Sequence, residues 1–311
     1  MWDYAPQRRQ RENLLRNSAV EARDVLLFAE ETRPSVQAIF LLRFLVGAAL
    51  AAGGGLTGWG PWLIGPALAW TLCAAFAYGL NGVCDVAEDR VNATGRPIAR
   101  GELAPESAAR LTWLCAALAL LFALAAGNAA LVGCVLAFLL LGYASSAGPR
   151  PLKRSTSATS AAVFAMGLLS YAAGWLAAGA GRPSGTAVVL AVGMAAWMAA
   201  VGAVTKDFAH ARGDAAAGRR TSVTAWGASA ARWVAGLGAL AVAAGFAVAA
   251  RPYGEALAPV TVVMAAGACV VAALCRTTLR DARRARRPYQ AFMVTQHAAH
   301  AVLLARLAEV V

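Results

Sequence analysis

The stretch NGVCDVAEDRVNATGRPIARGEL, residues 81–103, ends an apolar segment and brings acids, arginines and asparagines into a chain otherwise rich in Ala, Leu and Val. It begins with Asn81, Asp85 and Asp89, which follow one another at intervals of four residues. On a helix this spacing places the three side chains on one face, each about 6 Å further along the axis. Hard divalent cations such as Mg²⁺ take carboxylate and amide oxygens, retain water and bridge to phosphate oxygens. Because ionisable groups near membrane depth are costly and usually functional, this face predicts a metal–phosphate platform rather than a solvated helix end.

Apolar segments long enough to cross a membrane recur on both sides of this stretch. The 311 residues are 59% hydrophobic and 14% charged, with a mean hydropathy of +0.58, which is too apolar for an ordinary soluble domain. Frequent Ala and Gly residues suit close helix packing in lipid, whereas the strands of a membrane barrel would alternate apolar and polar residues. We therefore predict an all-α membrane protein with about nine transmembrane helices. Their expected ranges are 36–54, 61–82, 108–126, 129–147, 159–178, 185–204, 229–249, 256–275 and 289–307.

The formal net charge of +12 is distributed as a topology signal and not as a nucleic-acid surface. Arginines crowd the N-terminal tail and the connections after the second, fourth, sixth and eighth predicted helices, whereas the opposite connections hold few charges. This pattern predicts a multi-pass protein of the cell (inner) membrane with a cytoplasmic N-terminus, an outside C-terminus and no nucleic-acid partner. The basic run RTTLRDARRARRP, residues 276–288, is expected to bind headgroups of anionic membrane lipids.

The chain divides into a polar N-terminal part and a transmembrane domain. Residues 1–30 lack the apolar core of a signal peptide and form a cytoplasmic tail or, through the amphipathic VEARDVLLFAEE (20–31), a helix on the membrane surface. Residues 31–311 are expected to form the transmembrane domain.

A second polar connection, TKDFAHARGDAAAGRRTSV (205–223), also follows an even-numbered predicted helix. Asp207, His210 and Asp214 have an i, i+3, i+7 spacing, which predicts three potential metal ligands on one helical face. Between residues 34 and 250, every acidic residue lies in one of these two connections, on the predicted cytoplasmic side. The two acidic helix ends are therefore expected to face each other across the bundle.

Basic residues accompany both acidic segments. Arginine forks suit phosphate oxygens and lysine acts as a compact charge, although some of this basicity also serves the positive-inside signal. The residues are Arg96, Arg100, Lys153, Arg154, Lys206, Arg219 and Arg220. Two acidic faces, bound Mg²⁺ and these cations would grip a diphosphate, as an enzyme requires when diphosphate is the leaving group of a lipid tail. Apolar helices around the tail would shield a carbocation from water.

Several segments resemble the motifs of one family in the same order. NGVCDVAEDRVN (81–92) resembles the NxxxDxxxD motif of the UbiA superfamily of intramembrane prenyltransferases, and RPIARGELAPESA (96–108) resembles its continuation. ETRPSV (31–36), YASSAGPRPLKR (143–154) and KDFAHARGDAAAGRRT (206–221) resemble further family segments. The resemblance implies nine transmembrane helices around a central cavity, capped on the cytoplasmic side by the two Asp-rich loops. It also implies Mg²⁺-dependent transfer of an isoprenyl group from an isoprenyl diphosphate donor.

The resemblance further implies roles for individual residues. Ligands for Mg²⁺ would come from Asn81, Asp85, Asp89, Asp207, His210 and Asp214. Diphosphate would be bound by Arg96, Lys153, Lys206 and Arg219. Residues acting in catalysis would be Asp85, Asp89, Asp214, Tyr143 and Lys153. The allylic C–O bond would ionise, an aromatic or other lipophilic acceptor would attack the cation, and a proton would leave.

One position departs from the family pattern. The second motif of the family reads DxxxD, but His210 stands at its first aspartate, with Asp207 three residues upstream and Arg212 where many relatives carry an acid. A neutral His210 can ligate a metal and a protonated one can bind diphosphate, since the reference pKa of about 6.5 leaves both open. The change reflects either drift in a tolerant loop or a changed acceptor or reaction.

Two other functions fit parts of the pattern. A membrane-embedded terpene cyclase of the same superfamily would use the alkene of its own substrate in place of an acceptor. A polytopic transporter is a more distant alternative, because it would carry charged groups near the bilayer midplane, whereas the acids here lie at one membrane face. His297 and His300, in the last predicted helix, are expected to face the bundle interior, where they either bond to other helices or act in catalysis.

Overall fold

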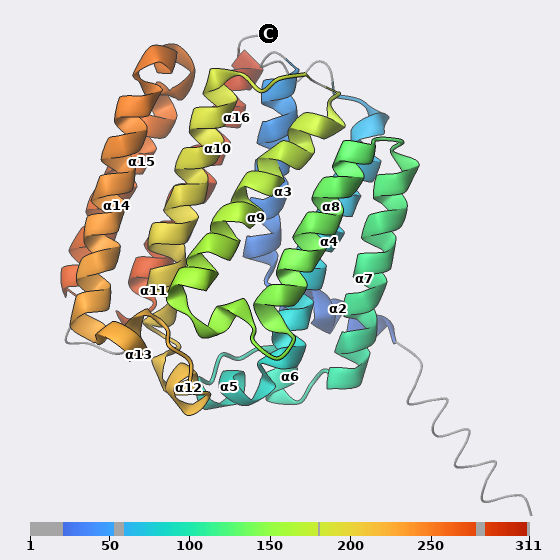
Figure 1. The fold of residues 1–311 in the computed structure, drawn as a ribbon, viewed down its shortest axis with the longest axis vertical. Coiled ribbons are helices and arrows are strands. Elements are labelled where there is room, and N and C mark those ends of the chain that lie inside the picture. Colours follow the sequence, from blue (N-terminus) through green and yellow to red (C-terminus); the bar gives the residue numbers. More distant parts are fainter. Residues whose placement is uncertain (1–20, 53–58, 180, 278–283, 310–311) are drawn as a thin grey trace, which may run out of the picture.

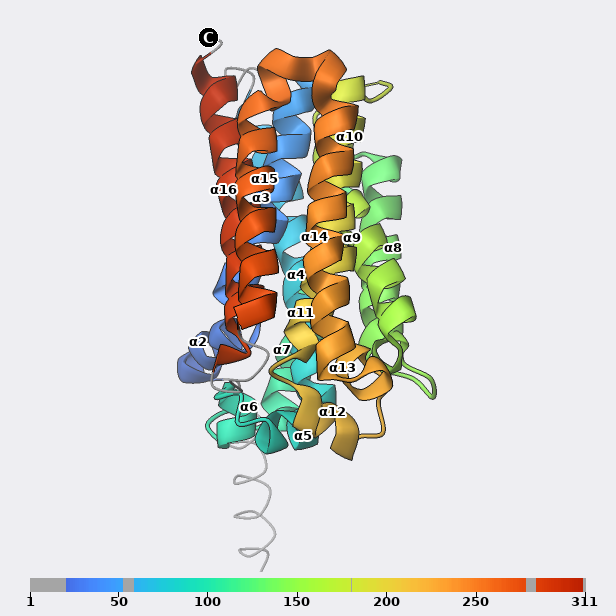
Figure 2. The same cartoon turned by 90° about the vertical axis from the view of Figure 1, so that its left-hand side faces the viewer.

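The computed structural model describes residues 21–52, 59–179, 181–277 and 284–309, which form helices joined by short turns. This described part contains no β-strand, and its one isolated bridge pairs Ser155 with Arg220. Long helices run side by side along the molecule, while short helices gather at one end (Figure 1, Figure 2). The predicted all-α class is confirmed.

Nine long helical segments of the described chain correspond to the predicted spans, and each observed end lies within three residues of the expected one. They are α3 (Pro34–Ala51), η1 with α4 (Pro61–Leu63, Ile64–Cys84), α7 (Pro105–Ala125), α8 (Ala129–Ser146), α9 (Thr156–Ala177), α10 with η3 and α11 (Gly185–Trp197, Met198–Gly202, Ala203–Asp207), α14 (Ala228–Ala250), α15 (Gly254–Thr277) and α16 (Arg287–Glu309). The shorter elements are α2 (Ala22–Glu31), α5 (Val86–Val91), α6 (Pro97–Arg100), η2 (Leu152–Arg154), α12 (Ala211–Ala216), α13 (Ser222–Trp226) and η4 (Arg251–Tyr253).

By length and composition, seven stretches of the described residues are able to cross a membrane. One of them, Ala228–Thr277, contains both α14 and α15, which pack against each other. α16 is not among the seven, because polar residues such as Gln296 and His300 lower its hydropathy. The structure therefore shows a multi-pass helical bundle, while the expected total of nine spans stays a prediction.

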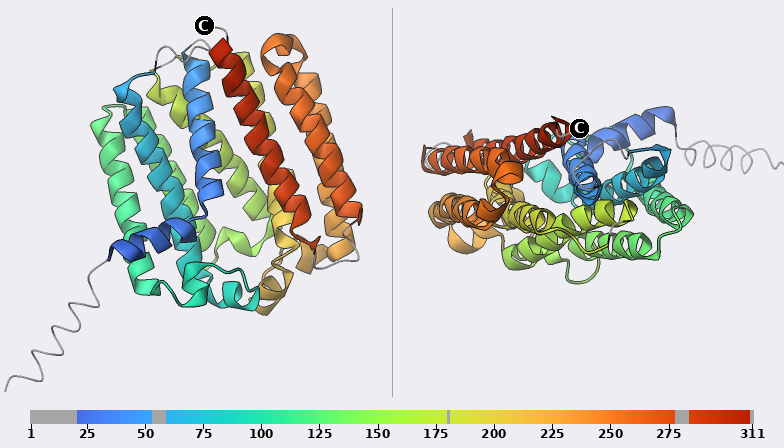
Figure 3. Two further views of the ribbon diagram at one scale, coloured as in Figure 1. Left: turned by 180° about the vertical axis from the view of Figure 1, so that it is seen from behind. Right: turned by 90° about the horizontal axis from the view of Figure 1, so that it is seen from above.

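The end of the bundle that carries the short helices is called the loop end below. It holds α5, α6, α12 and α13, and α2 lies across the ends of α4 and α7 there (dark blue in Figure 3). The last turns of α16 lie at the opposite end (Figure 1). The expected amphipathic helix is present as α2, but its contact with a membrane surface stays a prediction. The tail of residues 1–20 and residues 278–283 of the basic run lie outside the described residues.

An aromatic cluster holds the central helices together. Phe138 of α8 makes edge-to-face contacts with Phe40 of α3 at 5.4 Å and with Trp70 of α4 at 4.9 Å between ring centroids. Trp70 also stacks on Phe44, and all four side chains are buried. Such pairs add about 0.5–1.5 kcal/mol each beyond burial of their area. The cluster fixes α3 and α4, whose loop-end residues line the candidate site.

Candidate functional site

The two Asp-rich connections meet at the loop end, where α5 packs against α12 (Figure 2). The backbone amide of Gly213 donates to Oδ1 of Asn92 at 2.7 Å. A Cβ at position 213 would lie 2.2 Å from Asn92 Nδ2 and 2.8 Å from the carbonyl oxygen of Glu88, so this close approach requires glycine. The prediction that the two acidic helix ends face each other is therefore confirmed by the geometry.

Arg219 forms ion pairs with carboxylates of both Asp-rich connections. Its Nη2 lies 2.5 Å from Oδ1 of Asp85 and 2.8 Å from Oε1 of Glu88, and its Nη1 lies 3.5 Å from Oδ1 of Asp214. These four side chains are mostly buried, so solvent screens their attraction less than that of surface pairs. One arginine of the second loop thus neutralises carboxylates of both loops.

The helical register of Asn81, Asp85 and Asp89, the first acidic face, continues past the end of α4. α4 ends at Cys84, yet the amides of Asp85 and Asp89 still donate to the carbonyl oxygens four residues earlier, at 2.9 and 2.8 Å. Asn81 Nδ2 donates to Oδ2 of Asp85 at 2.8 Å, and Lys153 Nζ lies 2.5 Å from its Oδ1. Burial acts to raise the pKa of Asp85, but Lys153 and Arg219 outweigh it and lower the pKa below its ordinary value. Asp85 is therefore an ionised carboxylate beside two cations.

Arg96 has a different position from the expected one. Its Nη1 donates to Asp89 at 2.8 Å and to Asn81 at 3.3 Å, while its Nη2 donates to the carbonyl oxygens of Glu31 and Tyr78, both at 3.1 Å. Its Nε lies 2.6 Å from Oε1 of Glu31, a carboxylate with no exposed surface. Because all three nitrogens contact protein atoms, Arg96 holds the acidic face in place rather than offering donors to diphosphate. The spacing of residues in the sequence did not predict this role, nor the part played by Glu31.

The second acidic segment does not form one helical face, contrary to the prediction. α11 ends at Asp207 and α12 begins at Ala211, with a turn between them. Oδ2 of Asp207 accepts from the amide and the hydroxyl of Ser222, both at 2.9 Å, so this carboxylate fixes the start of α13. Asp214 instead faces Arg219, and burial raises its pKa despite the nearby cations.

His210 points toward a cavity of about 350 Å³, the side cavity, which is also lined by Lys206, Arg33 and Arg286. Burial first, and then the charges of Lys206 and Arg33, lower the pKa of His210 to about 3. The imidazole is therefore neutral at pH 7 in the free protein. The neutral form was one of the two expected states of His210, and it leaves a ring nitrogen able to ligate a metal, whereas the protonated form would bind diphosphate.

Lys206 stands where three cavities meet. It lines the side cavity, a central cavity of about 110 Å³ beside Asn81 and Lys153, and an inner cavity of about 90 Å³ that reaches into the bundle. Among the described residues, no side chain or backbone group forms a hydrogen bond or ion pair with its ammonium. The π-turn Met198–Gly202 lies directly before this last turn of helix, and such turns are frequent at functional sites. Lys206 is thus a cation that lines all three cavities and forms no hydrogen bond or ion pair with a described residue.

Arg33 supplies a second cation that the sequence analysis did not assign. It lines both the central and the side cavity, and its φ of 60° is unusual for a residue other than glycine. The following Pro34 begins α3, where its missing N–H costs nothing. A residue in this sparsely populated conformation costs about 1–3 kcal/mol and persists only where the surrounding structure holds it.

Tyr143 is not brought into the site. Its side chain is 43% exposed and its ring lies 6.4 Å from that of Trp113, on the outside of α8. Ser145 and Ser146 of the same segment line the central cavity instead, together with Lys153. The aromatic residues that do line this cavity are Tyr78 and Tyr289.

Oxygen atoms able to ligate a metal are present in the site, but basic side chains pair with them in the free protein. Within the described residues, no three His, Cys, Asp or Glu side chains form a group that would hold an ion. Asp85 and Asp89 nevertheless present ionisable oxygens beside the amide of Asn81, and hard oxygen ligands of this kind suit Mg²⁺. Because Asp85 is already paired with Lys153 and Arg219, and Asp89 with Arg96, any metal would share or replace these contacts.

The two histidines of α16 bond to other parts of the chain. His297 has its Nε2 3.0 Å from the carbonyl oxygen of Ser35, and His300 has its Nε2 2.5 Å from the hydroxyl of Tyr171. Both rings also lie against carbonyl oxygens of their own helix, at 2.8 and 2.5 Å. The structure thus shows the interhelical bonding that was one of their two expected roles.

Comparison with known proteins decides the family. The model of the UbiA prenyltransferase family matches residues 40–295, which is most of the chain. The chain belongs to the UbiA prenyltransferase family. Membership supports an integral, multi-pass membrane protein and, at the level of the family, intramembrane prenyl transfer.

Solved structures of UbiA proteins share the fold. A UbiA homolog from Archaeoglobus fulgidus bound to GPP and Mg²⁺ has a TM-score of 0.64 and 18% identity, covering 89% of this chain and 99% of its own. The same homolog bound to DMAPP and Mg²⁺ has a TM-score of 0.63, with equal identity and coverage. A structure of digeranylgeranylglyceryl phosphate synthase has a TM-score of 0.60 and 14% identity, covering 92% of this chain and 99% of its own. No curated protein matches the sequence.

Proposed function

We propose that this UbiA protein transfers an isoprenyl group, inside the membrane and with Mg²⁺, from an isoprenyl diphosphate to an aromatic or other lipophilic acceptor. One observation carries the proposal most directly. Lys206, a cation without a partner among the described residues, faces cavities whose wall also holds Asn81 and Lys153 of the acidic face. The UbiA homolog from Archaeoglobus fulgidus was solved bound to GPP or DMAPP together with Mg²⁺, which supports a donor of this class.

The donor diphosphate would bind at the mouth of the central cavity. Lys206 and Arg33 line it as cations whose side chains form no ion pair with a described residue, and Lys153 reaches it from the other side while paired with Asp85. Lysine and arginine stabilise phosphate oxygens in such a setting, and the partly dry site strengthens the attraction. As the diphosphate departs, these cations would hold the negative charge that develops on the leaving oxygen.

Residues of the acidic face would hold the metal. Asn81, Asp85 and Asp89 supply the hard oxygens from the first loop, and Asp214 supplies a carboxylate from the second. Bound Mg²⁺ would neutralise the diphosphate and promote its departure as a Lewis acid. Arg219, which pairs with carboxylates of both loops in the free protein, would give up contacts to the metal and contact the diphosphate instead.

The apolar walls would protect the allylic cation. Tyr78 and Tyr289 line both the central and the inner cavity, together with Val163. Aromatic faces stabilise a nearby cation, and exclusion of water prevents its hydrolysis. The acceptor would attack from the inner cavity and then lose a proton. We further propose that the loop end faces the cytoplasm, because it carries most of the basic connections.

The proposal is tested with the purified chain in lipid nanodiscs. A labelled isoprenyl diphosphate is supplied with Mg²⁺, with and without a panel of lipophilic acceptors, and products are separated by mass. We expect a product containing both donor and acceptor, formed only with Mg²⁺. A hydrocarbon or terpene alcohol formed as the main product without acceptor would instead support the cyclase alternative.

A further inference from the structure

The outer edge of the bundle has a groove between α14 and α15, two helices that pack against each other at one side of the molecule (orange in Figure 1 and Figure 2). Its volume is about 450 Å³, and Trp233, Leu237 and Leu240 of α14 line it with exposed side chains. The groove begins at the loop end, because Arg232 lies in the second turn of α14 and Arg276 in the last turn of α15. None of its lining residues belongs to the side, central or inner cavity, so the groove is separate from the candidate active site.

Arg232 contributes a buried guanidinium with few partners to this groove. Only 6% of the residue is exposed, and no carboxylate among the described residues pairs with it. Its Nη1 donates to the carbonyl oxygen of Ala228 over a long 3.4 Å, and its enclosed Nε forms no hydrogen bond. The guanidinium lies 4.8 Å from the ring centroid of Phe208, which offsets part of the cost of burial. A buried arginine without a counter-ion is costly, above all inside a membrane, and an anion bound beside it would remove that cost.

A second arginine lies at the mouth of the groove. Arg276 is exposed, and its guanidinium lies 5.9 Å from the ring centroid of Trp233. It forms no ion pair with a described residue, and none of the described residues that line the groove is acidic. Arginine suits phosphate oxygens, and tryptophan is typical of the membrane–water interface. The two arginines and the tryptophan therefore mark the level of lipid headgroups.

Beyond the arginines the walls of the groove are apolar. Gly236 and Leu240 of α14 lie across from Ala272 and Ala273 of α15. The eight residues from Arg232 to Leu240 rise by about 12 Å along a helix, which is close to the depth of one leaflet, about half of a hydrocarbon core of roughly 30 Å. An acyl chain whose phosphate lies at the arginines would follow this wall.

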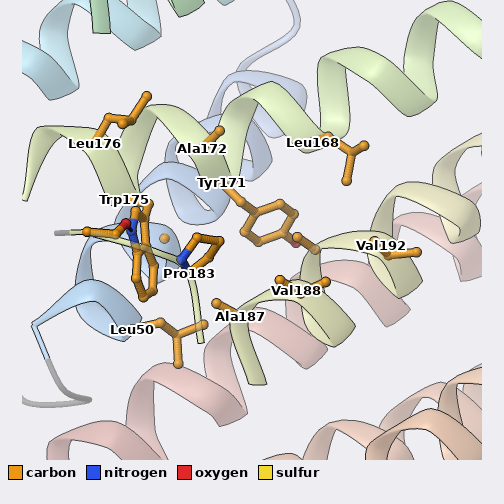
Figure 4. A pocket seen from close by; sticks show the side chains of 13 residues that line it. Leu50, Leu168, Tyr171, Ala172, Trp175, Leu176, Pro183, Ala187, Val188 and Val192 are labelled. Carbon is orange, nitrogen blue, oxygen red and sulfur yellow. Dashed lines mark hydrogen bonds between the residues drawn. The ribbon is translucent and has the colours of Figure 1, made fainter. Parts of the chain in front are cut away.

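Another apolar pocket lacks the charged part of this arrangement. It lies between α9 and α10, has a volume of about 330 Å³ and is lined in part by Tyr171, Trp175 and Val188 (Figure 4). Nε1 of Trp175 donates to the carbonyl oxygen of Gly181 at 2.9 Å, and none of the described residues that line the pocket is charged. This pocket suits an apolar chain alone, whereas the groove combines an apolar wall with two arginines that have no counter-ion.

From the buried charge of Arg232 at the loop end of an apolar groove, we propose that α14 and α15 bind one anionic phospholipid. Its phosphodiester accepts from Arg232 and Arg276, and one acyl chain lies along Gly236 and Leu240. A zwitterionic phospholipid is disfavoured, because its headgroup cation would lie beside two arginines with no acid in the groove.

The position of the groove agrees with such a ligand. The loop end is proposed to face the cytoplasm, where the leaflet carries anionic lipids. The basic run 276–288, expected to bind lipid headgroups, begins at Arg276. The groove adds a site for a single lipid with defined partners, and this inference does not depend on the proposed prenyl transfer.

The test compares two phospholipids that differ only in their headgroup. The full-length chain, purified in a neutral detergent, is titrated with phosphatidylglycerol or phosphatidylcholine of identical acyl chains, and native mass spectrometry counts the bound lipids. We expect the first phosphatidylglycerol to bind wild type about tenfold more tightly than phosphatidylcholine and to raise the melting temperature more. Arg232→Met should weaken phosphatidylglycerol binding by about tenfold, the cost of one charged hydrogen bond, and Arg232→Lys should keep part of the affinity.

Two matched controls separate the groove from the general surface. Arg251→Met removes an exposed arginine at the opposite end of α14 and should keep wild-type binding. Ala273→Phe fills the groove without removing a charge, so it should also weaken phosphatidylglycerol binding. Its control is Val270→Phe, a change at an exposed position of α15 that does not line the groove.

Three results would overturn the inference. The first is equal affinity of wild type for the two phospholipids. The second is an unchanged preference for phosphatidylglycerol in Arg232→Met or, if that variant does not fold, in Ala273→Phe. The third is displacement of phosphatidylglycerol by an equal concentration of inorganic phosphate, which would assign the two arginines to a soluble anion.

Discussion

Nη2 of Arg219 lies 2.5 Å from Oδ1 of Asp85, across 134 residues of sequence. This contact ties the second Asp-rich loop to the first at the point where the proposed metal and diphosphate would bind. A guanidinium in this position balances the carboxylate before the substrate arrives, and the metal would have to compete with it.

Replacement of Arg219 should therefore change metal and donor binding in opposite directions. In Arg219→Met, Mg²⁺ alone should bind more tightly because its competitor is gone, while the KM for the donor should rise by about tenfold, the cost of one charged hydrogen bond. Metal titration and initial rates measure the two quantities. Arg90→Met, which removes an exposed arginine of α5, is the control and should change neither. Equal changes in Arg90→Met would contradict the assignment.

Lys206 should be required for donor binding and unfavourable for stability. Lys206→Met removes the cation that faces the central and inner cavities, so the KM for the donor should rise by about ten- to a hundredfold. The melting temperature without donor should rise, because the variant loses a half-buried charge that forms no ion pair with a described residue. Lys206→Arg should recover part of the donor affinity. A fall in melting temperature with an unchanged KM would assign Lys206 a structural role.

Gly82 should tolerate no side chain. A Cβ there would lie 2.2 Å from Oε1 of Glu31 and 2.7 Å from Nη2 of Arg96. Gly82→Ala should therefore separate the buried pair that holds Asp89 and Asn81, lowering both the melting temperature and activity. Gly65→Ala is the matched control in the same helix, because its Cβ meets no atom within 4 Å and alanine favours helix by up to about 1 kcal/mol. Equal melting temperatures for the two variants would contradict this account.

His210 should make the protein sensitive to acid. Its folded pKa of about 3 lies below the unfolded value of about 6.5, so the unfolded chain binds more protons between these limits. The stability that His210 contributes is therefore present above pH 6.5 and is lost as pH falls toward 3. Melting curves without Mg²⁺ or donor should show wild type losing more stability than His210→Gln between pH 7.5 and pH 5. Parallel losses in the two proteins would show that His210 is not the cause.

The sequence was sufficient to predict the bundle and the meeting of the two loops. Long apolar segments specify membrane helices, and acids confined to two connections on one side must lie at one end of such a bundle. The i, i+4, i+8 spacing of the first motif was also informative, because hydrogen bonds at Asp85 and Asp89 preserve the helical register across the break. The roles of the individual ligands stay proposals.

The rotation of a helix about its axis was not readable from the sequence. Tyr143 was expected near the reaction centre, but α8 turns it outward against Trp113. The face predicted for the second motif is interrupted by a turn, and Ser222 binds Asp207 there. Spacing defines which residues share a face only where a helix continues, and it does not say which way that face points.

Arg43 illustrates the opposite case, in which the sequence carries a signal that lies outside the motifs. It is a lone cation within an apolar segment, and such residues in membrane spans usually face the interior and serve a function. Its partner Gln296 lies 253 residues away, so only the folded chain shows the pair. The burial of Glu31 against Arg96 is a contact of the same kind.

The central claim is that the carboxylates of the two loops support Mg²⁺-dependent loss of diphosphate from an isoprenyl donor. Release of diphosphate in nanodiscs, measured with and without Mg²⁺, tests it most directly in wild type, Asp85→Asn and Asp214→Asn. Glu106→Gln, a change at an exposed acid in the first turn of α7, is the control. We predict that wild type and Glu106→Gln release diphosphate only with Mg²⁺, and that both aspartate variants lose about a thousandfold in rate. Unchanged Mg²⁺-dependent release in Asp85→Asn and Asp214→Asn would contradict the account.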